Sequence, residues 1–98
     1  MPSFMGGDLM TFRNWVMSKV RFPQIALENQ ISGQVLLSFV VERDGSLTNI
    51  QVLRTPDASL SDEAIRVLKS SPKWTPGKQR NQAVRVKYTL PIEFRIQN

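Results

Sequence analysis

Apolar residues recur near the start of this chain at spacings of three and four, which is the period of one face of a helix. The stripe consists of Leu9, Phe12, Val16 and Val20. Trp15 borders this stripe, and Asp8 precedes it after Gly6-Gly7. Asp8 is placed to cap the helix by accepting from the free amides of the first turn. The helix should end before Pro23, because the residue preceding a proline is pushed out of the α region.

Pro23 can serve as the first residue of a second, short helix that runs through Glu28. We expect this helix to stop between Asn29 and Gly33, where asparagine and glycine are available for a left-handed conformation.

From Gln34 onward the apolar period changes to two, which predicts a strand with one buried face. The residues on that face are Val35, Leu37, Phe39 and Val41, and those on the opposite face are Gln34, Ser38 and Glu42. Asp44-Gly45 is the strongest kind of short hairpin signal. A second strand over residues 47–54 should therefore return antiparallel to the first, and residues 55–58 are expected to form a loop.

A third helix is expected to start at Ser59, with Asp62 and Glu63 near its start, where the helix dipole favours anions. Its buried stripe would consist of Leu60, Ala64, Val67 and Leu68. Ser71-Pro72 should end it, and a turn is expected at Pro76-Gly77.

The most regular pattern comes last, with an apolar residue at every second position from Val84 to Ile96. The intervening positions are mostly basic or polar: Arg85, Lys87, Thr89, Pro91, Glu93 and Arg95. This pattern predicts one long strand over residues 84–96, with a core face and a wet, basic face. The order helix, short helix, strand, strand, helix, strand predicts a single α+β domain over residues 1–98. Its architecture would be a two-layer sandwich, a three-stranded antiparallel sheet with helices packed on one face.

Pro91 indicates that the last strand is an edge, because a residue without an N–H cannot sit in the middle of a fully paired strand. Two interpretations of that edge remain open from the residues alone. Proline and charge can simply protect an exposed edge from aggregation. Alternatively, the edge can stay open to pair with an extended peptide, and its charges would then favour acidic partners. A second copy of the chain could also pair there and give a homodimer.

The composition argues against catalysis. The chain has no cysteine and no histidine, which removes the usual nucleophile–base pairs and the commonest metal ligands. Adjacent Asp62 and Glu63 on a helix point in different directions, and Glu42 and Asp44 flank a hairpin. The glycines form no phosphate-binding loop. We therefore expect no enzyme activity, no metal and no cofactor.

The net charge of +5 is unevenly distributed. Residues 1–65 carry five Lys/Arg against seven Asp/Glu, whereas residues 66–98 carry eight against one. A basic half can attract nucleic acid, anionic lipid or an acidic peptide. Base stacking needs aromatic residues on the open sheet face, and the aromatic residues of the strands fall in the core registers, so nucleic acid is the weaker alternative. No run of about 20 apolar residues is present, so any membrane anchor would have to lie outside this chain.

Several short segments, in order, resemble the TonB carboxy-terminal domain family. They are Phe22-Pro23 with Ala26, Ile31 with Gly33 and Val35, Phe39-Val40-Val41, Asp44-Gly45-Ser46, Ile50 with Val52, Asp62-Glu63-Ala64, Pro72 with Trp74 and Pro76-Gly77-Lys78, and Leu90-Pro91-Ile92 with Phe94. The segment from Trp74 to Lys78 is the most specific of these. Pro2-Ser3-Phe4 followed by Gly6-Gly7-Asp8 is similar to versions common in Bacteroidetes-type bacteria.

The resemblance implies a periplasmic domain of a protein anchored in the inner membrane by an amino-terminal helix and energised by partners of the ExbB–ExbD kind. Such domains capture the "TonB box" peptide of outer-membrane transporters as a strand added along the last β-strand. By position, the peptide site carries over to Val84, Arg85, Val86, Lys87, Tyr88, Thr89 and Leu90. The contact with the transporter plug carries over to Lys19, Val20 and Arg21, with Lys19 in place of the glutamine of the best-known members.

Other roles fit the same resemblance. The domain could be attached to a sensor or a periplasmic peptidase, or it could have a TolA-like role with another envelope partner. These alternatives differ in what precedes the domain.

Overall fold

The computed structural model describes residues 3–4, 6–75 and 77–96. The molecule is elongated, about 50 × 21 × 17 Å. Its elements follow one another in this order: α1 (Leu9–Lys19), α2 (Gln24–Glu28), β1 (Gly33–Val41), β2 (Leu47–Arg54), α3 (Ala58–Lys69), β3 (Gly77–Gln79), β4 (Gln82–Val84) and β5 (Val86–Phe94).

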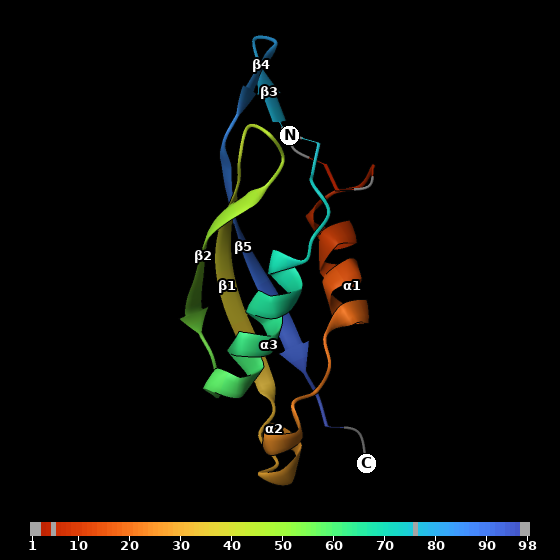
Figure 1. Cartoon of the computed structure of the whole chain (residues 1–98), viewed down its shortest axis with the longest axis vertical. Coiled ribbons are helices and arrows are strands. Elements are labelled where there is room, and N and C mark those ends of the chain that lie inside the picture. Colours follow the sequence, from red (N-terminus) through yellow and green to blue (C-terminus); the bar gives the residue numbers. More distant parts are fainter. Residues whose placement is uncertain (1–2, 5, 76, 97–98) are drawn as a thin grey trace.

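The main sheet has three antiparallel strands in the order β2-β1-β5. Figure 1 shows α1 and α3 on one face of this sheet, with α2 at its lower end. This arrangement confirms the predicted two-layer α+β sandwich. It also confirms that the last strand is an edge, since β5 has β1 as its only neighbour in that sheet.

The core lies between the sheet and α3. The predicted inner face of β1 is fully buried, and so is the predicted stripe of α3; these residues are Val35, Leu37, Phe39, Val41, Leu60, Ala64, Val67 and Leu68. Burial of each valine, leucine or phenylalanine side chain in this set stabilises the folded state by roughly 1.5–3 kcal/mol. Ser38, expected on the wet face, is on that face but is only 1% exposed.

Aromatic side chains make a second part of the core between α1 and the sheet. Phe12 of α1 packs against Trp74 with the ring centroids 4.8 Å apart, and Trp74 packs against Tyr88 of β5 at 5.5 Å. Phe4 joins them through Phe12 at 4.8 Å. Tyr88 is half-buried here, so the helix-facing side of the edge strand is fixed by contacts from distant parts of the chain.

The boundaries of α1 confirm the predicted capping. Asp8 is the N-cap, and its carboxylate accepts from the Thr11 amide at 3.2 Å. Pro23 lies one position before α2 and acts as its N-cap. After α2 the positive φ values belong to Gln30, at 55°, and to Gly33, at 138°, so the expected glycine is used but the expected Asn29 is not.

The predicted start of α3 was wrong. The helix begins at Ala58 and is capped by Asp57, whose carboxylate accepts from the Ser59 amide at 2.9 Å. Asp62 and Glu63 therefore lie beyond the first turn, which has no acidic residue. The residue that caps the helix, Asp57, belongs to the segment 55–58 that was expected to form a loop.

The final strand is shorter than predicted, and a hairpin precedes it. Strands β3 and β4 pair as a two-stranded ribbon, joined by Arg80 and Asn81 at φ 52° and 65°. A two-residue turn with both φ values positive suits a hairpin, but it usually carries glycine, and no glycine marks this one. The expected turn at 76–77 lies partly outside the described residues. Within the part of the chain that the structure describes, no helix is long and apolar enough to cross a membrane.

Candidate peptide-binding edge

The two edges of the main sheet differ in regularity. Strand β2 pairs with β1 through a register that shifts twice, and Asn49 in β2 has a left-handed φ of 51°. Such irregularities bend a strand and interrupt its row of hydrogen-bonding groups. Strand β5 pairs with β1 over nine consecutive residue pairs without a shift, from Val86 to Phe94. Only the β5 edge therefore presents a regular backbone for another strand.

Pro91 shows which backbone groups of β5 point to the open side. In an antiparallel pair, a residue either exchanges both N–H and C=O bonds with the residue opposite or turns both groups away. Pro91 has no N–H, and its carbonyl oxygen accepts from Arg13 Nε at 3.3 Å, so it belongs to the second kind. Because the two kinds alternate along a regular strand, Thr89 and Lys87 also turn their N–H and C=O groups to the open side.

The sequence-predicted peptide site, residues 84–90, spans two strands. Val84 is the last residue of β4 and pairs with Gly77 of β3. Arg85 lies between the two strands, and the other five residues belong to β5. The side chains of Arg85, Lys87 and Thr89 are exposed, whereas Val86, Tyr88 and Leu90 are half-buried or buried.

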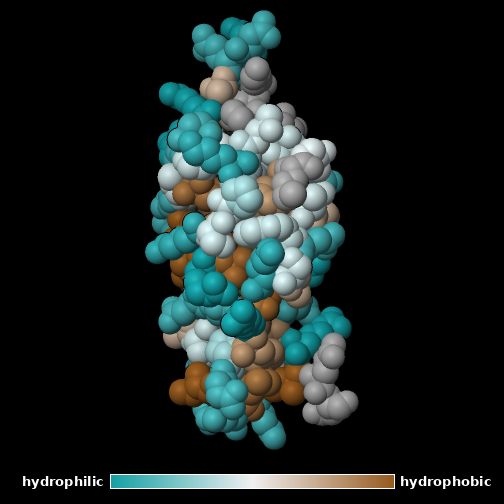
Figure 2. All heavy atoms as spheres, turned by 45° about the vertical axis from the view of Figure 1, so that its right-hand side comes forward, coloured by the Kyte–Doolittle hydropathy of each residue, from teal (hydrophilic) through white to brown (hydrophobic). Residues whose placement is uncertain are grey.

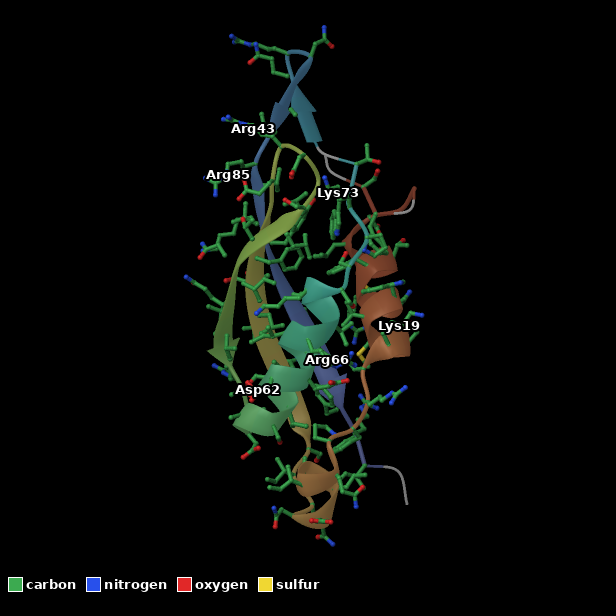
Figure 3. The ribbon with its side chains drawn as sticks, viewed as in Figure 1. Lys19, Arg43, Asp62, Arg66, Lys73 and Arg85 are labelled. Atoms are coloured by element: carbon green, nitrogen blue, oxygen red, sulfur yellow. The ribbon has the colours of Figure 1, made fainter. Side chains whose placement is uncertain are left out.

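Arg85 is already engaged within the domain. Its guanidinium binds Glu42 of the β1–β2 hairpin through two contacts, Nε to Oε1 at 2.7 Å and Nη2 to Oε2 at 3.1 Å. Hydrogen bonds from Arg85 and Thr48 lower the pKa of the Glu42 carboxyl, so the pair stays ionised at neutral pH. Figure 3 shows Arg85 and Arg43 near the upper end of the molecule. Lys87 has no carboxylate partner among the described residues, and it supplies the uncompensated charge of the edge.

The predicted plug-contact residues lie at the other end of β5, where α1 leads into α2. Lys19 ends α1, and Val20 is its half-buried C-cap. The Arg21 amide donates to Glu63 Oε2 at 2.6 Å. Arg66 also binds Glu63, at 2.7 Å, and it lowers the pKa of that carboxyl.

A basic hollow of about 420 Å³ lies at this turn and is lined by Lys19, Arg21, Glu63, Arg66, Val67 and Ser70. Since Glu63 is held by Arg66, positive charge dominates the hollow. The structure therefore does not bring residues 19–21 into the same site as residues 84–90. Residues 86–90 lie along the β5 edge, whereas Lys19 and Arg21 face α3 across the basic hollow, and Val20 borders the C-terminal part of β5.

The acidic side chains of the described residues are dispersed over the fold. No group of three or more His, Cys, Asp or Glu side chains among them could hold a metal ion. Asp44 accepts from the Ser46 amide at 2.9 Å within the hairpin, which is a turn contact, not acid–base chemistry. Phe39 and Phe94 are buried and Tyr88 packs into the aromatic cluster, so the open face of the sheet lacks the aromatic platform that base stacking needs.

Two residues of the edge were missed from the sequence. Arg13 contacts the carbonyl of Pro91, and Met17 lies one turn further along α1 beside β5. The signal was present, because Arg13 and Met17 precede Val20, the last residue of the predicted stripe, at spacings of four and three and so continue the face of Val20 beside that stripe. A cation at the border of an apolar stripe did not by itself indicate a contact with a strand.

The fold and its edge define a class, a small α+β binding domain. Residues 18–96 match the family described as Gram-negative bacterial TonB protein C-terminal, and the chain belongs to that family. This family is non-enzymatic. Protein TonB of Helicobacter pylori, strain J99, is 31% identical over 96 residues, which cover 97% of this chain. The same residues cover 33% of that relative, so the chain spans about a third of its length.

Solved structures agree with this assignment. One fragment of the H. pylori TonB C-terminal domain superimposes with a TM-score of 0.67 and 32% identity, covering 89% of this chain and 91% of that one. A longer fragment of the same domain gives a TM-score of 0.70 and 27% identity, covering 92% and 81%. The Pseudomonas aeruginosa TonB C-terminal domain gives 0.67 at 24% identity, covering 84% and 83%, and supports the fold alone. The similarity to Bacteroidetes-type versions stays a prediction.

Proposed function

We propose that this chain is the periplasmic, partner-binding domain of a TonB-type energy transducer. It captures the TonB-box peptide of an outer-membrane transporter as a strand added beside residues 84–90. The observation that carries the proposal is the unequal pair of edges. Strand β5 is regular over nine residue pairs, whereas β2 is bulged, so the register shifts that interrupt an edge occur on the β2 side and not on the β5 side.

The backbone supplies the affinity in this mode, and the side chains adjust it. The outward N–H and C=O groups of Lys87 and Thr89 pair with the peptide backbone, each bond contributing about 0.5–1.5 kcal/mol. Lys87 favours an acidic residue in the partner. A strand pulled along its own axis loads several of these bonds together, so the interface resists shear and suits the transmission of force.

The rest of the transducer is part of the same proposal. Lys19, Val20 and Arg21 contact the transporter plug. A membrane anchor and the contact with an ExbB–ExbD-type complex belong to parts of the protein outside this chain. The length of the curated relatives, about three times that of this chain, supports a larger protein.

An amide NMR titration tests the proposal. The 98-residue domain is titrated with a TonB-box peptide from a transporter of the same organism and with a scrambled peptide of the same composition. We expect shifts concentrated on residues 84–90, with Lys87 and Thr89 the largest, and no such pattern with the scrambled peptide. If those amides stay unchanged in a folded, monomeric domain, the capture of a transporter by this edge is wrong.

A further inference from the structure

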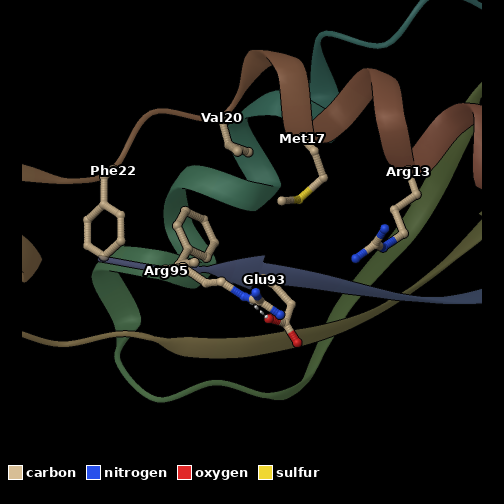
Figure 4. A pocket seen from close by; sticks show the side chains of 7 residues that line it. Arg13, Met17, Val20, Phe22, Glu93 and Arg95 are labelled. Atoms are coloured by element: carbon tan, nitrogen blue, oxygen red, sulfur yellow. Dashed lines mark hydrogen bonds and ion pairs between the residues drawn. The ribbon is translucent and has the colours of Figure 1, made fainter. Parts of the chain in front are cut away.

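A groove of about 500 Å³ lies between α1 and the C-terminal part of β5. Figure 4 shows Met17 and Val20 reaching from α1 toward the strand, with Phe22 beside them. These three apolar side chains are half-buried, so they form a wall that is still open to a partner. The groove lies within the size range of sites that hold small ligands, and it has room for one large side chain.

The groove begins beside Pro91, where the outward row of backbone groups on β5 is interrupted. Pro91 offers no N–H to a new strand, and Arg13 already occupies its carbonyl oxygen. A peptide paired with Lys87 and Thr89 therefore meets a break in the outward row at Pro91, before the outward groups of Glu93, and it can leave the edge there. Arg13 lines the groove as well, so the residue that holds the Pro91 carbonyl also borders the next available surface.

The other end of the groove reaches the turn between α1 and α2. Val20 is part of its wall and is the middle residue of the segment 19–21. The groove thus connects the open edge to the basic turn, which are otherwise separate surfaces. It also depends on Arg13 and Met17, which precede the segment that matches the family, residues 18–96.

The charges at the rim are unequal. Arg95 binds Glu93 at 2.8 Å, so these two charges compensate each other. Arg13 has no carboxylate partner among the described residues, since its contact there is a backbone carbonyl. The rim is therefore net positive, and it favours a carboxylate next to whatever apolar group enters the groove.

We propose that this groove is an anchor subsite for the captured peptide. It takes one large apolar side chain, best an aromatic one, placed immediately beyond the stretch that pairs with β5 and next to an acidic residue. The inference rests on the proposed function, because the occupant is the continuation of the same peptide. Strand pairing depends on backbone groups and accepts many sequences. The groove adds a requirement for a large apolar side chain at one position of the peptide.

Paired peptides separate the two ideas. The TonB-box peptide is extended by Phe-Glu at either end, and matched versions carry Ser-Glu instead. Binding is followed by the amides of Lys87 and Thr89 and by the methyl signals of Met17 and Val20. We expect one of the two phenylalanine peptides to bind about tenfold more tightly than its serine counterpart, equivalent to about 1.4 kcal/mol. Only that peptide should move the Met17 methyl.

Two variants of α1 provide the control. Met17→Glu places a charge in the groove and should abolish the advantage of phenylalanine while leaving the binding of the serine peptide within twofold. Met10→Glu puts the same charge two turns away on the same helix, at a side chain that is 56% exposed and does not line the groove, and it should leave the advantage intact. Unchanged amide spectra away from the substituted residue establish that both variants are folded.

The possible results lead to different conclusions. If both kinds of peptide move Lys87 and Thr89 but phenylalanine brings no gain at either end, the anchor subsite is wrong and strand capture stands. If no peptide moves these amides, the proposed function fails and the subsite with it. If the Met17 methyl signal shifts while the amides of Lys87 and Thr89 do not, the groove binds the peptide independently of β5. The proposal that the groove holds the continuation of the paired strand is then wrong.

Discussion

Pro91 and Arg13 together interrupt the outward row of backbone groups on β5. Pro91 has no amide proton, and Arg13 holds its carbonyl at 3.3 Å. The open donors that precede it belong to Lys87 and Thr89. Because so few backbone N–H groups are open to a peptide, the removal of one should lower the affinity measurably.

Thr89→Pro removes one outward N–H and keeps the rest of the edge. Proline is tolerated two residues away in the same outward register, at Pro91, so the fold should persist. We expect binding of the TonB-box peptide, measured by calorimetry, to weaken about two- to tenfold, the loss of one hydrogen bond of about 0.5–1.5 kcal/mol.

Thr89→Val is the matched control, since it removes the hydroxyl group but keeps the amide. Its affinity should stay close to that of the original chain. Equal affinities for the proline and valine variants would mean that the Thr89 amide takes no part in capture.

Single polar residues were harder to assign from the sequence than apolar ones. The sequence predicts Asp57 in a loop and Asp62 near the start of the third helix, because nothing in the local spacing marks Asp57 as a cap. In the structure Asp57 is the cap, because its carboxylate accepts a hydrogen bond from the Ser59 amide. Glu63 instead binds the Arg21 amide, 42 positions away along the chain, a contact that no local pattern contains.

Phe12 is the residue of α1 that packs most deeply into the aromatic part of the core. This ring is fully buried and packs against Phe4, Trp74 and Phe39. Phe12→Ala should lower the free energy of unfolding by about 3–5 kcal/mol, a large part of the stability of a small domain. Urea denaturation followed by tryptophan fluorescence measures it.

Met10→Ala on the same helix is the control, because its exposed side chain should change stability by less than about 0.5 kcal/mol. If the Phe12 variant were as stable as this control, α1 would be a loosely attached helix. The groove beside β5 would then lack a fixed wall.

Among whole elements, strand β1 could be predicted from the sequence and the hairpin β3–β4 could not. Strand β1 has an apolar residue at every second position from Val35 to Val41 and carries Asp44-Gly45 after it, so its position, its buried face and its pairing with β2 could be predicted. Residues 77–84 have no alternation and no glycine at the turn, so the hairpin was missed. The open edge followed from Pro91 alone. The groove did not, because it depends on the packing of α1 against β5.

Four carboxyl groups, distributed over the hairpin and α3, have a lowered pKa in the folded chain. Their partners donate hydrogen bonds to the ionised form: Arg85 to Glu42, Ser46 to Asp44, Ser59 to Asp57 and Arg66 to Glu63. Since each folded pKa lies below the unfolded value, the stabilisation is complete above the unfolded pKa values. It is lost as the pH falls through the folded ones.

The melting temperature should therefore be nearly constant above about pH 5 and should decline progressively below about pH 4. Glu63→Gln removes one of these groups, so the difference in melting temperature between pH 7 and pH 3 should shrink by a few degrees. Differential scanning calorimetry across this range measures it. If the melting temperature fell equally in both proteins, the ion pair between Glu63 and Arg66 would make no contribution to the stability of the fold.

Figure 2 shows apolar surface at the lower end of the molecule, where α2 lies, while much of the remaining face is hydrophilic. Ile25 and Leu27 of α2 are 60% and 40% exposed. Exposed apolar side chains also occur at Met10 of α1 and at Val52 and Leu53 of β2, so apolar surface is not confined to α2.

The bulged β2 edge also limits polymerisation. If two copies paired through β5, the combined sheet would end in β2 on both sides, and neither end would present a regular template for a third copy. Self-association of this kind would stop at two chains and would compete directly with the peptide proposed for the same edge. The sheet would therefore accept one added partner at a time: crowding could exchange the proposed peptide for a second copy, but it could not extend this sheet into a fibre.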